Sequence, residues 1–155
     1  MPYYTRAFCT DDSCPSIDQL EATLNRDNPA ARLDTDDDRE SDSWDFAEYY
    51  YKEGNQPIVV EINRNHGSES LAAEESQEFI EKIGKPGLSM SKRRVINQLK
   101  NTRFIVSCQL LGDIDDDGFH WNGELLNYFV RNHAGMFQAD GEGFYDGHKV
   151  TVELS

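Results

Sequence analysis

The sequence has few cysteines and no long apolar run. Cysteine occurs only at positions 9, 14 and 108, and no two of these residues have CxxC spacing. An odd number of cysteines without that spacing predicts free thiols in a reducing compartment, although a bond between Cys9 and Cys14 stays open. No stretch reaches the roughly 18 consecutive apolar residues of a membrane helix, and the first residues lack the apolar segment of a secretory signal. We therefore expect a cytoplasmic protein that does not enter membranes.

Patterns typical of enzymes are also missing. The chain contains no GxGxxG, P-loop or GxSxG motif, and its four histidines lack the spacing of zinc ligands. Ser89 to Lys92 matches the SxxK pattern, but the companion motifs of that pattern are absent. An enzyme of unknown class stays an alternative, with a site built from residues that form no motif. The nearest candidates for its titrating group are His120 and His148, because both are expected in loops beside acids.

Positive charge is scarce. The 15 lysines and arginines stand against 29 acids, which gives a net charge of −14. Such a surface repels the backbone of a nucleic-acid duplex, so we expect no duplex partner. It suits a basic protein partner, a bound cation, or solubility alone. Hydrophobic residues still make up 37% of the chain and aromatic residues 11%, which indicates a packed core. With no repeat and no long linker, residues 1–155 are predicted to form one domain.

The hydrophobic pattern predicts a series of strands and helices. Strands are expected at residues 3–10, 44–51, 58–63 and 104–111. Helices are expected after Ser16, over 71–83, after Ser89 or Ser91, and after Asn122. The polar stretch from Leu33 to Ser43 is expected to be a solvated loop. The dipeptide Asp146-Gly147 between alternating segments predicts a C-terminal hairpin.

This order of elements indicates an α+β fold. The first six elements follow the βαββαβ order of ferredoxin-like folds, in which helices cover one face of an antiparallel sheet. The last helix and the β-hairpin would form a C-terminal extension of that unit. Folds of this kind carry many unrelated functions, so the function has to be argued from particular sites.

One acidic segment has the spacing of calcium ligands. Residues 113–124 fit the EF-hand pattern D-x-D-x-D-G-x5-E. Calcium prefers six to eight oxygen ligands, which alternate aspartates in a tight loop can supply. The expected ligands are Asp113, Asp115, Asp117, the Phe119 carbonyl and Glu124.

Other observations favour a purely structural role for the same segment. Aspartates are common in turns, and Asn122 and Glu124 suit the beginning of a helix. The preceding element is expected to be a strand, whereas an EF-hand loop follows a helix. His120 also occupies the position where an apolar side chain normally packs against a second loop. Calcium binding and a capped turn are therefore both kept as hypotheses.

The charges are segregated along the chain. A strongly acidic segment contains Asp34, Asp36, Asp37 and Asp38, whereas Lys92, Arg93 and Arg94 belong to a stretch without acids between Lys82 and Gly112. The three cations are a candidate anion site near a helix N-terminus. The alternative is that they pair with the acidic segment across the fold, or are simply solvated.

These features lead to three hypotheses of different classes. The leading one is an acidic protein-interaction module, comparable in composition to inhibitor or immunity proteins, which binds a basic partner through Asp34, Asp36, Asp37 and Asp38. The second is a calcium-binding regulatory or structural domain that uses the 113–124 segment. The third is the enzyme of unknown class.

Overall fold

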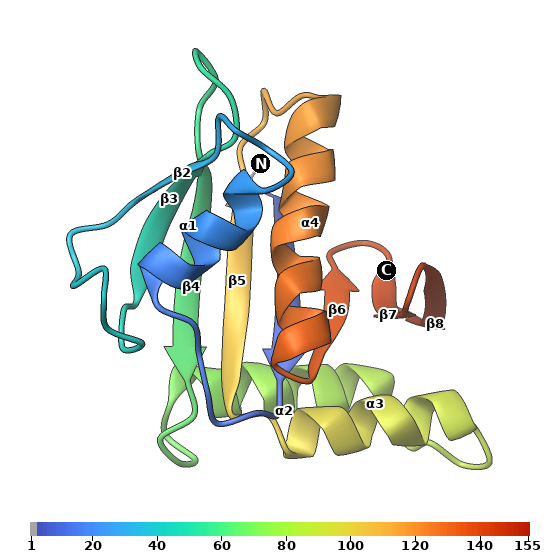
Figure 1. Cartoon of the computed structure of the whole chain (residues 1–155). Helices are drawn as coiled ribbons and strands as arrows, with labels where there is room; N and C mark the ends of the chain where they lie inside the picture. The colour runs from blue at the N-terminus through green and yellow to red at the C-terminus, as the bar shows by residue number, and fades with distance from the viewer. Residues whose placement is uncertain (1–2) are drawn as a thin grey trace.

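The computed structural model describes residues 3–155 as one eight-stranded antiparallel sheet with four helices (Figure 1). The strands are β1 (Tyr3–Cys9), β2 (Arg32–Asp34), β3 (Phe46–Tyr50), β4 (Ile58–Arg64), β5 (Phe104–Leu110), β6 (Gly135–Ala139), β7 (Gly143–Asp146) and β8 (Lys149–Glu153). The helices are α1 (Ile17–Asn25), α2 (Leu71–Ile83), α3 (Met90–Lys100) and α4 (Asp116–Asn132). The expected α+β class and antiparallel sheet are confirmed.

The order of the strands differs from the ferredoxin-like prediction. The sheet runs β2-β3-β4-β5-β1-β6-β7-β8. A ferredoxin-like unit would place β1 beside β4, whereas here β5 pairs antiparallel with both of them. The ferredoxin-like arrangement is therefore not confirmed. Element order alone allowed both topologies, because the same six elements can be arranged with either β1 or β5 next to β4.

The helices cover both faces of the sheet. On one face, α1 and α4 pack over a core formed by the alternate inward residues of β1, β3, β4 and β5. On the other face, α2 and α3 pack over Phe8, Ile105 and the hairpin residues Phe144 and Val152. The prediction that the helices lie on one face was wrong. Each helix is amphipathic, but its apolar stripe does not indicate which face of a sheet it covers.

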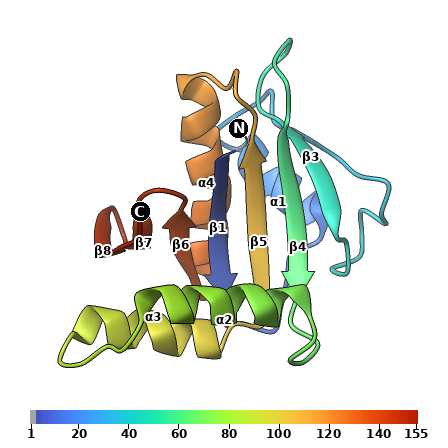
Figure 2. The same cartoon turned by 180° about the vertical axis from the view of Figure 1, so that it is seen from behind.

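Helices α2 and α3 cover only part of their face. Figure 2 shows both helices across the end of the sheet where β1 ends and β5 begins, while the other ends of β1, β5, β4 and β3 have no helix in front of them. Arg6 marks the boundary, because its Nε lies 2.5 Å from Oε1 of Glu75 on α2. Beyond Arg6 this face of the sheet is not covered by a helix.

Several local predictions are confirmed. Ser16 caps α1 in a capping box with Gln19, and Ser89 rather than Ser91 caps α3. The C-terminal hairpin forms as β7 and β8. Strand β2, however, lies in the stretch that was expected to be a loop, and β6 was not predicted.

The structure also bears on the expectations about thiols and membranes. Cys9, Cys14 and Cys108 are all free thiols, so Cys9 and Cys14 do not form a bond here. Burial raises the pKa of the Cys14 thiol to about 11. No helix within residues 3–155 is both long and apolar enough to span a bilayer.

Candidate functional site

Helix α4 begins seven residues earlier than the sequence predicted. Asp115, not Asn122, is the N-cap residue, and its carboxylate accepts a hydrogen bond from the Gly118 N–H at 2.9 Å. Asn122 is buried inside the helix and donates to Thr5 Oγ1 at 3.0 Å. The prediction favoured Asn122 because the aspartate-rich residues before it resemble a loop. Acids in a first helical turn are instead stabilised by the helix dipole.

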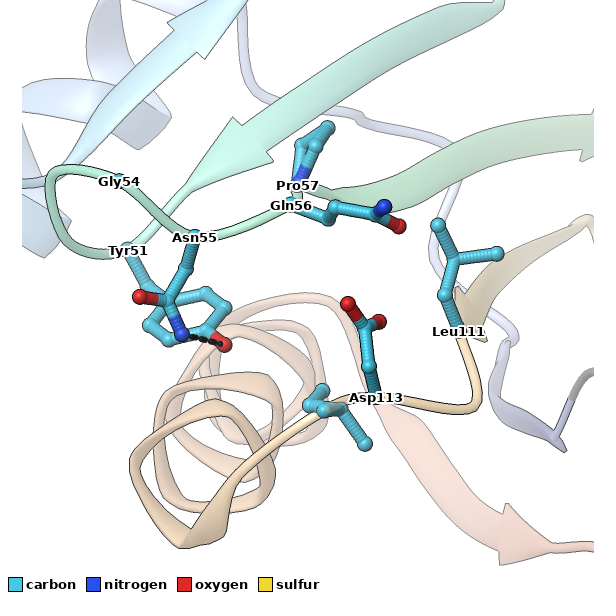
Figure 3. A pocket seen from close by; sticks show the side chains of 8 residues that line it. Tyr51, Gly54, Asn55, Gln56, Pro57, Leu111 and Asp113 are labelled. Atoms are coloured by element: carbon cyan, nitrogen blue, oxygen red, sulfur yellow. Dashed lines mark hydrogen bonds between the residues drawn. The ribbon is translucent and has the colours of Figure 1, made fainter.

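Asp115 is surrounded by donors from the turn between β3 and β4. Tyr51 and Asn55 donate to its carboxylate at 3.1 Å each, and Lys52 Nζ lies 2.7 Å away. The bond between Asn55 and the Tyr51 hydroxyl is drawn in Figure 3. The Lys52 ammonium and the Gly118 N–H hold the pKa of Asp115 well below its usual range. Its oxygens are therefore occupied by protein groups.

The five predicted calcium ligands do not converge. Asp113 points into a separate cavity of about 300 Å³ beside Gln56 (Figure 3), whereas Asp117 pairs with Lys52 at 2.9 Å. Phe119 and Glu124 lie within α4, so the carbonyl of Phe119 belongs to a helix rather than to a calcium loop. Among residues 3–155, no three His, Cys, Asp or Glu side chains are grouped as a metal ion requires. The EF-hand arrangement is not present.

The acidic segment around Asp34 lies along the start of β3. Asp37 accepts hydrogen bonds from the backbone N–H groups of Asp45 and Phe46 at 2.9 and 3.4 Å, which fixes the segment to that strand. Asp36 and Asp38 are exposed, and within the described residues neither forms an ion pair. Asp34 has only a loose contact of 3.7 Å with Arg32. The segment is thus held in place through Asp37 while its other carboxylates face solvent.

The three predicted anion-binding cations do not contact this acidic segment. They occupy successive positions in α3, so their side chains leave the helix in different directions. Arg93 donates to the Gly87 carbonyl at 3.0 Å, and Arg94 pairs with Asp146 at 2.8 Å. Lys92 makes no ion pair in the described part of the chain. The acidic segment is therefore not neutralised by Lys92, Arg93 or Arg94.

A surface that the sequence analysis missed lies on the uncovered part of the sheet. We call it the open face and define it by nine residues on five neighbouring strands: Tyr4, Arg32, Asp34, Phe46, Glu48, Tyr50, Val59, Glu61 and Gln109. All nine point away from the core that α1 and α4 cover.

The open face combines apolar and acidic side chains. Phe46 is 43% exposed, and it is paired in register with the exposed acid Glu61. Val59 lies opposite Glu48 in the same pair of strands. A signal was present in the sequence, because strict alternation in β3 and β4 places these side chains on the second face. Alternation does not indicate how many helices cover each face, however, so the pattern alone does not predict an open face.

The two histidines proposed for an enzyme line one cleft. His120 comes from α4 and His148 from the turn between β7 and β8, and both border a cavity of about 680 Å³. Both side chains are exposed. The structure thus brings together two residues that are 28 positions apart in the sequence.

The chain matches no protein-family model, no curated protein and no solved structure.

Proposed function

We propose that this protein is an interaction module that binds a basic protein partner through the open face and the acidic segment beside it. The observation that carries the proposal is the exposed Phe46 among the acids of an uncovered sheet face. Aromatic side chains at the centre of an interface provide most of its binding energy, while charged groups around them select the partner.

The first support is the composition of the open face. Tyr4, Phe46, Tyr50 and Val59 supply apolar area, whereas Asp34, Glu48 and Glu61 supply negative charge. A partner with exposed arginine or lysine and apolar side chains is complementary to both. A purely apolar partner would leave the carboxylates desolvated without a counter-charge, which costs free energy.

The second support is the position of the acidic segment. Asp37 attaches this segment to the backbone of Asp45 and Phe46, at one end of the open face. Asp36 and Asp38 therefore extend the negative surface next to Phe46. Exposed acids at the rim of an interface accelerate the approach of a cationic partner and make binding sensitive to salt.

The third support comes from arginines of the chain itself. The guanidinium of Arg32 lies 4.3 Å from the centre of the Tyr50 ring, and that of Arg6 lies 5.4 Å from the centre of the Tyr4 ring. Both distances are typical of cation–π contacts. Rings of this face thus already contact guanidinium groups of the chain itself, and the exposed ring of Phe46 offers the same kind of contact to an arginine of a partner.

The test is affinity capture from cell extract with the wild-type protein, followed by identification of the retained protein and measurement of its affinity. We expect a protein with a positively charged surface, and we expect its affinity to fall as salt increases. Phe46→Ala should weaken binding by tenfold or more, because a central aromatic residue contributes about 2 kcal/mol or more. The double variant Asp36→Asn, Asp38→Asn should weaken binding chiefly at low salt.

The matched control is Leu88→Ala. Leu88 is 96% exposed and lies between α2 and α3, outside the open face. Its replacement should leave the affinity unchanged. The proposal is wrong if no basic protein is retained, or if Phe46→Ala and Leu88→Ala change the affinity equally.

A further inference from the structure

A second cleft, bordered by His120 and His148, lies away from the open face. It has a volume of about 680 Å³, within the range of small-molecule sites. One wall is the side of α4 that carries His120, Gly123 and Arg131, and the opposite wall comes from β6 and the β7–β8 turn. Arg94 of α3 also lines the cleft. Two helices, one strand and a hairpin turn that are distant in sequence therefore contribute to one cavity.

Neither packing nor backbone conformation requires a glycine at position 123. Glycine weakens the interior of a helix relative to alanine, and Gly123 lies near the middle of α4. A Cβ atom at this position would have no neighbour within 4 Å, so packing does not require glycine. The position instead lines the cleft. A side chain there would reduce the volume of the cleft and keep an occupant away from the helix backbone.

The other glycines near this position contrast with Gly123. A Cβ at Gly118 would lie 2.2 Å from Ile114 Cγ1, and one at Gly135 would lie 3.0 Å from the Phe129 carbonyl oxygen. Gly147 has a φ of 62°, which favours glycine in the turn of a hairpin. Each of these three is required by packing or by backbone conformation. Of these four glycines, only Gly123 has neither reason, and its position in the wall of the cleft is the remaining explanation.

The polar groups of the cleft favour an anion. Arg131 makes no ion pair within residues 3–155, and its Nε and Nη2 lie 3.2 and 3.1 Å from the Asn127 amide oxygen in the orientation that satisfies both groups. His120 and His148 border the same cavity. Of the two acids present, Asp146 is already paired with Arg94, which leaves Glu124. In a chain with a net charge of −14, the lining of this cleft thus has two arginines and two histidines against two acids.

The remainder of the lining is apolar. Phe119, Val130, Met136 and Phe137 contribute to it, and Phe119 is 49% exposed. Phe137 also packs edge-on against Tyr145, with the ring centres 5.2 Å apart. An occupant with an aromatic or aliphatic body would bury these side chains, while one anionic group could accept hydrogen bonds from Arg131.

We infer that this cleft is a binding site for a small organic anion with an apolar body, such as an aryl carboxylate. The anionic group binds Arg131, with His120 or His148 as a second donor. The apolar body lies along α4, where Gly123 allows it to approach the backbone. This site is separate from the open face and does not depend on the function proposed for it.

The test is a titration followed by amide chemical shifts, with 2-naphthoate and its neutral counterpart 2-naphthamide as probes. We expect 2-naphthoate to shift the amide signals of Gly123, Gly135 and Gly147. It should also bind about tenfold or more tightly than the amide, because charge-assisted hydrogen bonds are the stronger ones. Arg131→Gln should remove most of this preference for the anion.

A pair of variants at Gly123 separates binding from folding. Gly123→Ala should raise the melting temperature, because alanine favours a helix and meets no neighbour there. Gly123→Leu should also fold, and its side chain should fill the cleft and weaken binding of both probes. The inference fails if neither probe binds at millimolar concentration, if the shifts fall outside the cleft, or if Arg131→Gln leaves the preference unchanged. It also fails if Gly123→Leu binds as wild type does.

Discussion

Two aspartate-rich segments look alike in the sequence and differ in the structure. In residues 113–117, the Asp115 carboxylate is surrounded by Tyr51, Lys52, Asn55 and the Gly118 N–H. In residues 34–42, Asp37 binds backbone N–H groups, but Asp36 and Asp38 face solvent. The first segment is therefore part of the structure of the fold, whereas the second is available to another molecule.

The difference comes from the elements that lie beside each segment. The 113–117 segment faces the turn between β3 and β4, which supplies an ammonium, an amide and a hydroxyl. The acidic segment follows the edge strand β2 and receives little compensating charge: Arg32 makes only a 3.7 Å contact with Asp34, Arg39 binds Asp18 and Glu21, and Arg64 binds Asp45. Acid spacing alone predicts neither outcome.

The largest effect is expected from Gly118→Ala. Its Cβ would lie 2.2 Å from Ile114 Cγ1 and 2.9 Å from the Tyr51 hydroxyl, next to the donors of Asp115. Crowding of this kind should lower the free energy of unfolding by about 1–3 kcal/mol, measured by urea denaturation. The control is Gly112→Ala, where a Cβ would meet no atom within 4 Å. Equal losses in the two variants would contradict the close packing around Asp115.

A second effect concerns the pH dependence of stability. The pKa of Asp115 is lowered chiefly by Lys52 and by the Gly118 N–H, so its ionised form stabilises the folded state. This stabilisation should be fully present above the ordinary aspartate pKa of about 3.9 and should be lost as the pH falls through the lower folded pKa. Thermal melts of wild type and Asp115→Asn should therefore differ most near neutral pH and converge in acid. A constant difference at all pH values would show that Asp115 is not held in its ionised form.

The sequence predicted some elements of the fold but not the interactions around Asp115. The apolar spacing of 71–83 and the alternation of 58–63 predicted α2 and β4, because burial on one side dictates those periods. The beginning of α4 was not predicted, since Asp115 and Asn122 are both good caps and only the donors at Tyr51, Lys52 and Asn55 favour Asp115. Those donors are about 60 residues away in the sequence.

The candidate sites were predicted less well than the elements. The open face depends on β5 lying between β1 and β4, and on α2 and α3 covering only one end of the sheet. Both are results of tertiary packing, which single-sequence patterns do not contain. Strand β2 was missed because it has three residues, of which only Leu33 is buried apolar. The exposed position of Asp36 and Asp38, however, agrees with the prediction of a solvated segment.

A smaller effect is expected from salt. Because the acidic segment is not clamped by Lys92, Arg93 or Arg94, its carboxylates repel one another, and added salt should screen this repulsion. The melting temperature of the wild type should rise between low salt and about 0.5 M sodium chloride. The triple variant Asp34→Asn, Asp36→Asn, Asp38→Asn should respond less. A wild type that melts lower at high salt would indicate that internal ion pairs dominate instead.

The smallest effect is expected from Phe46→Ala on stability. Phe46 is 43% exposed and points away from the core, so its replacement should change the free energy of unfolding by no more than about 0.5 kcal/mol. The same variant should weaken partner binding strongly. Urea denaturation of the free protein checks the first statement. A loss well above that value would mean that Phe46 supports the fold rather than a partner.

The most direct test of the proposed partner surface is hydrogen exchange of the protein with and without a captured partner. Protection on binding should appear in β3, β4 and the acidic segment, where the open face and its acids lie. Residues 113–117 should exchange at the same rate in both states, because the carboxylates of Asp115 and Asp117 are already bound to Lys52 within the fold. Protection confined to 113–117, or to the helix-covered parts of the sheet, would contradict the account.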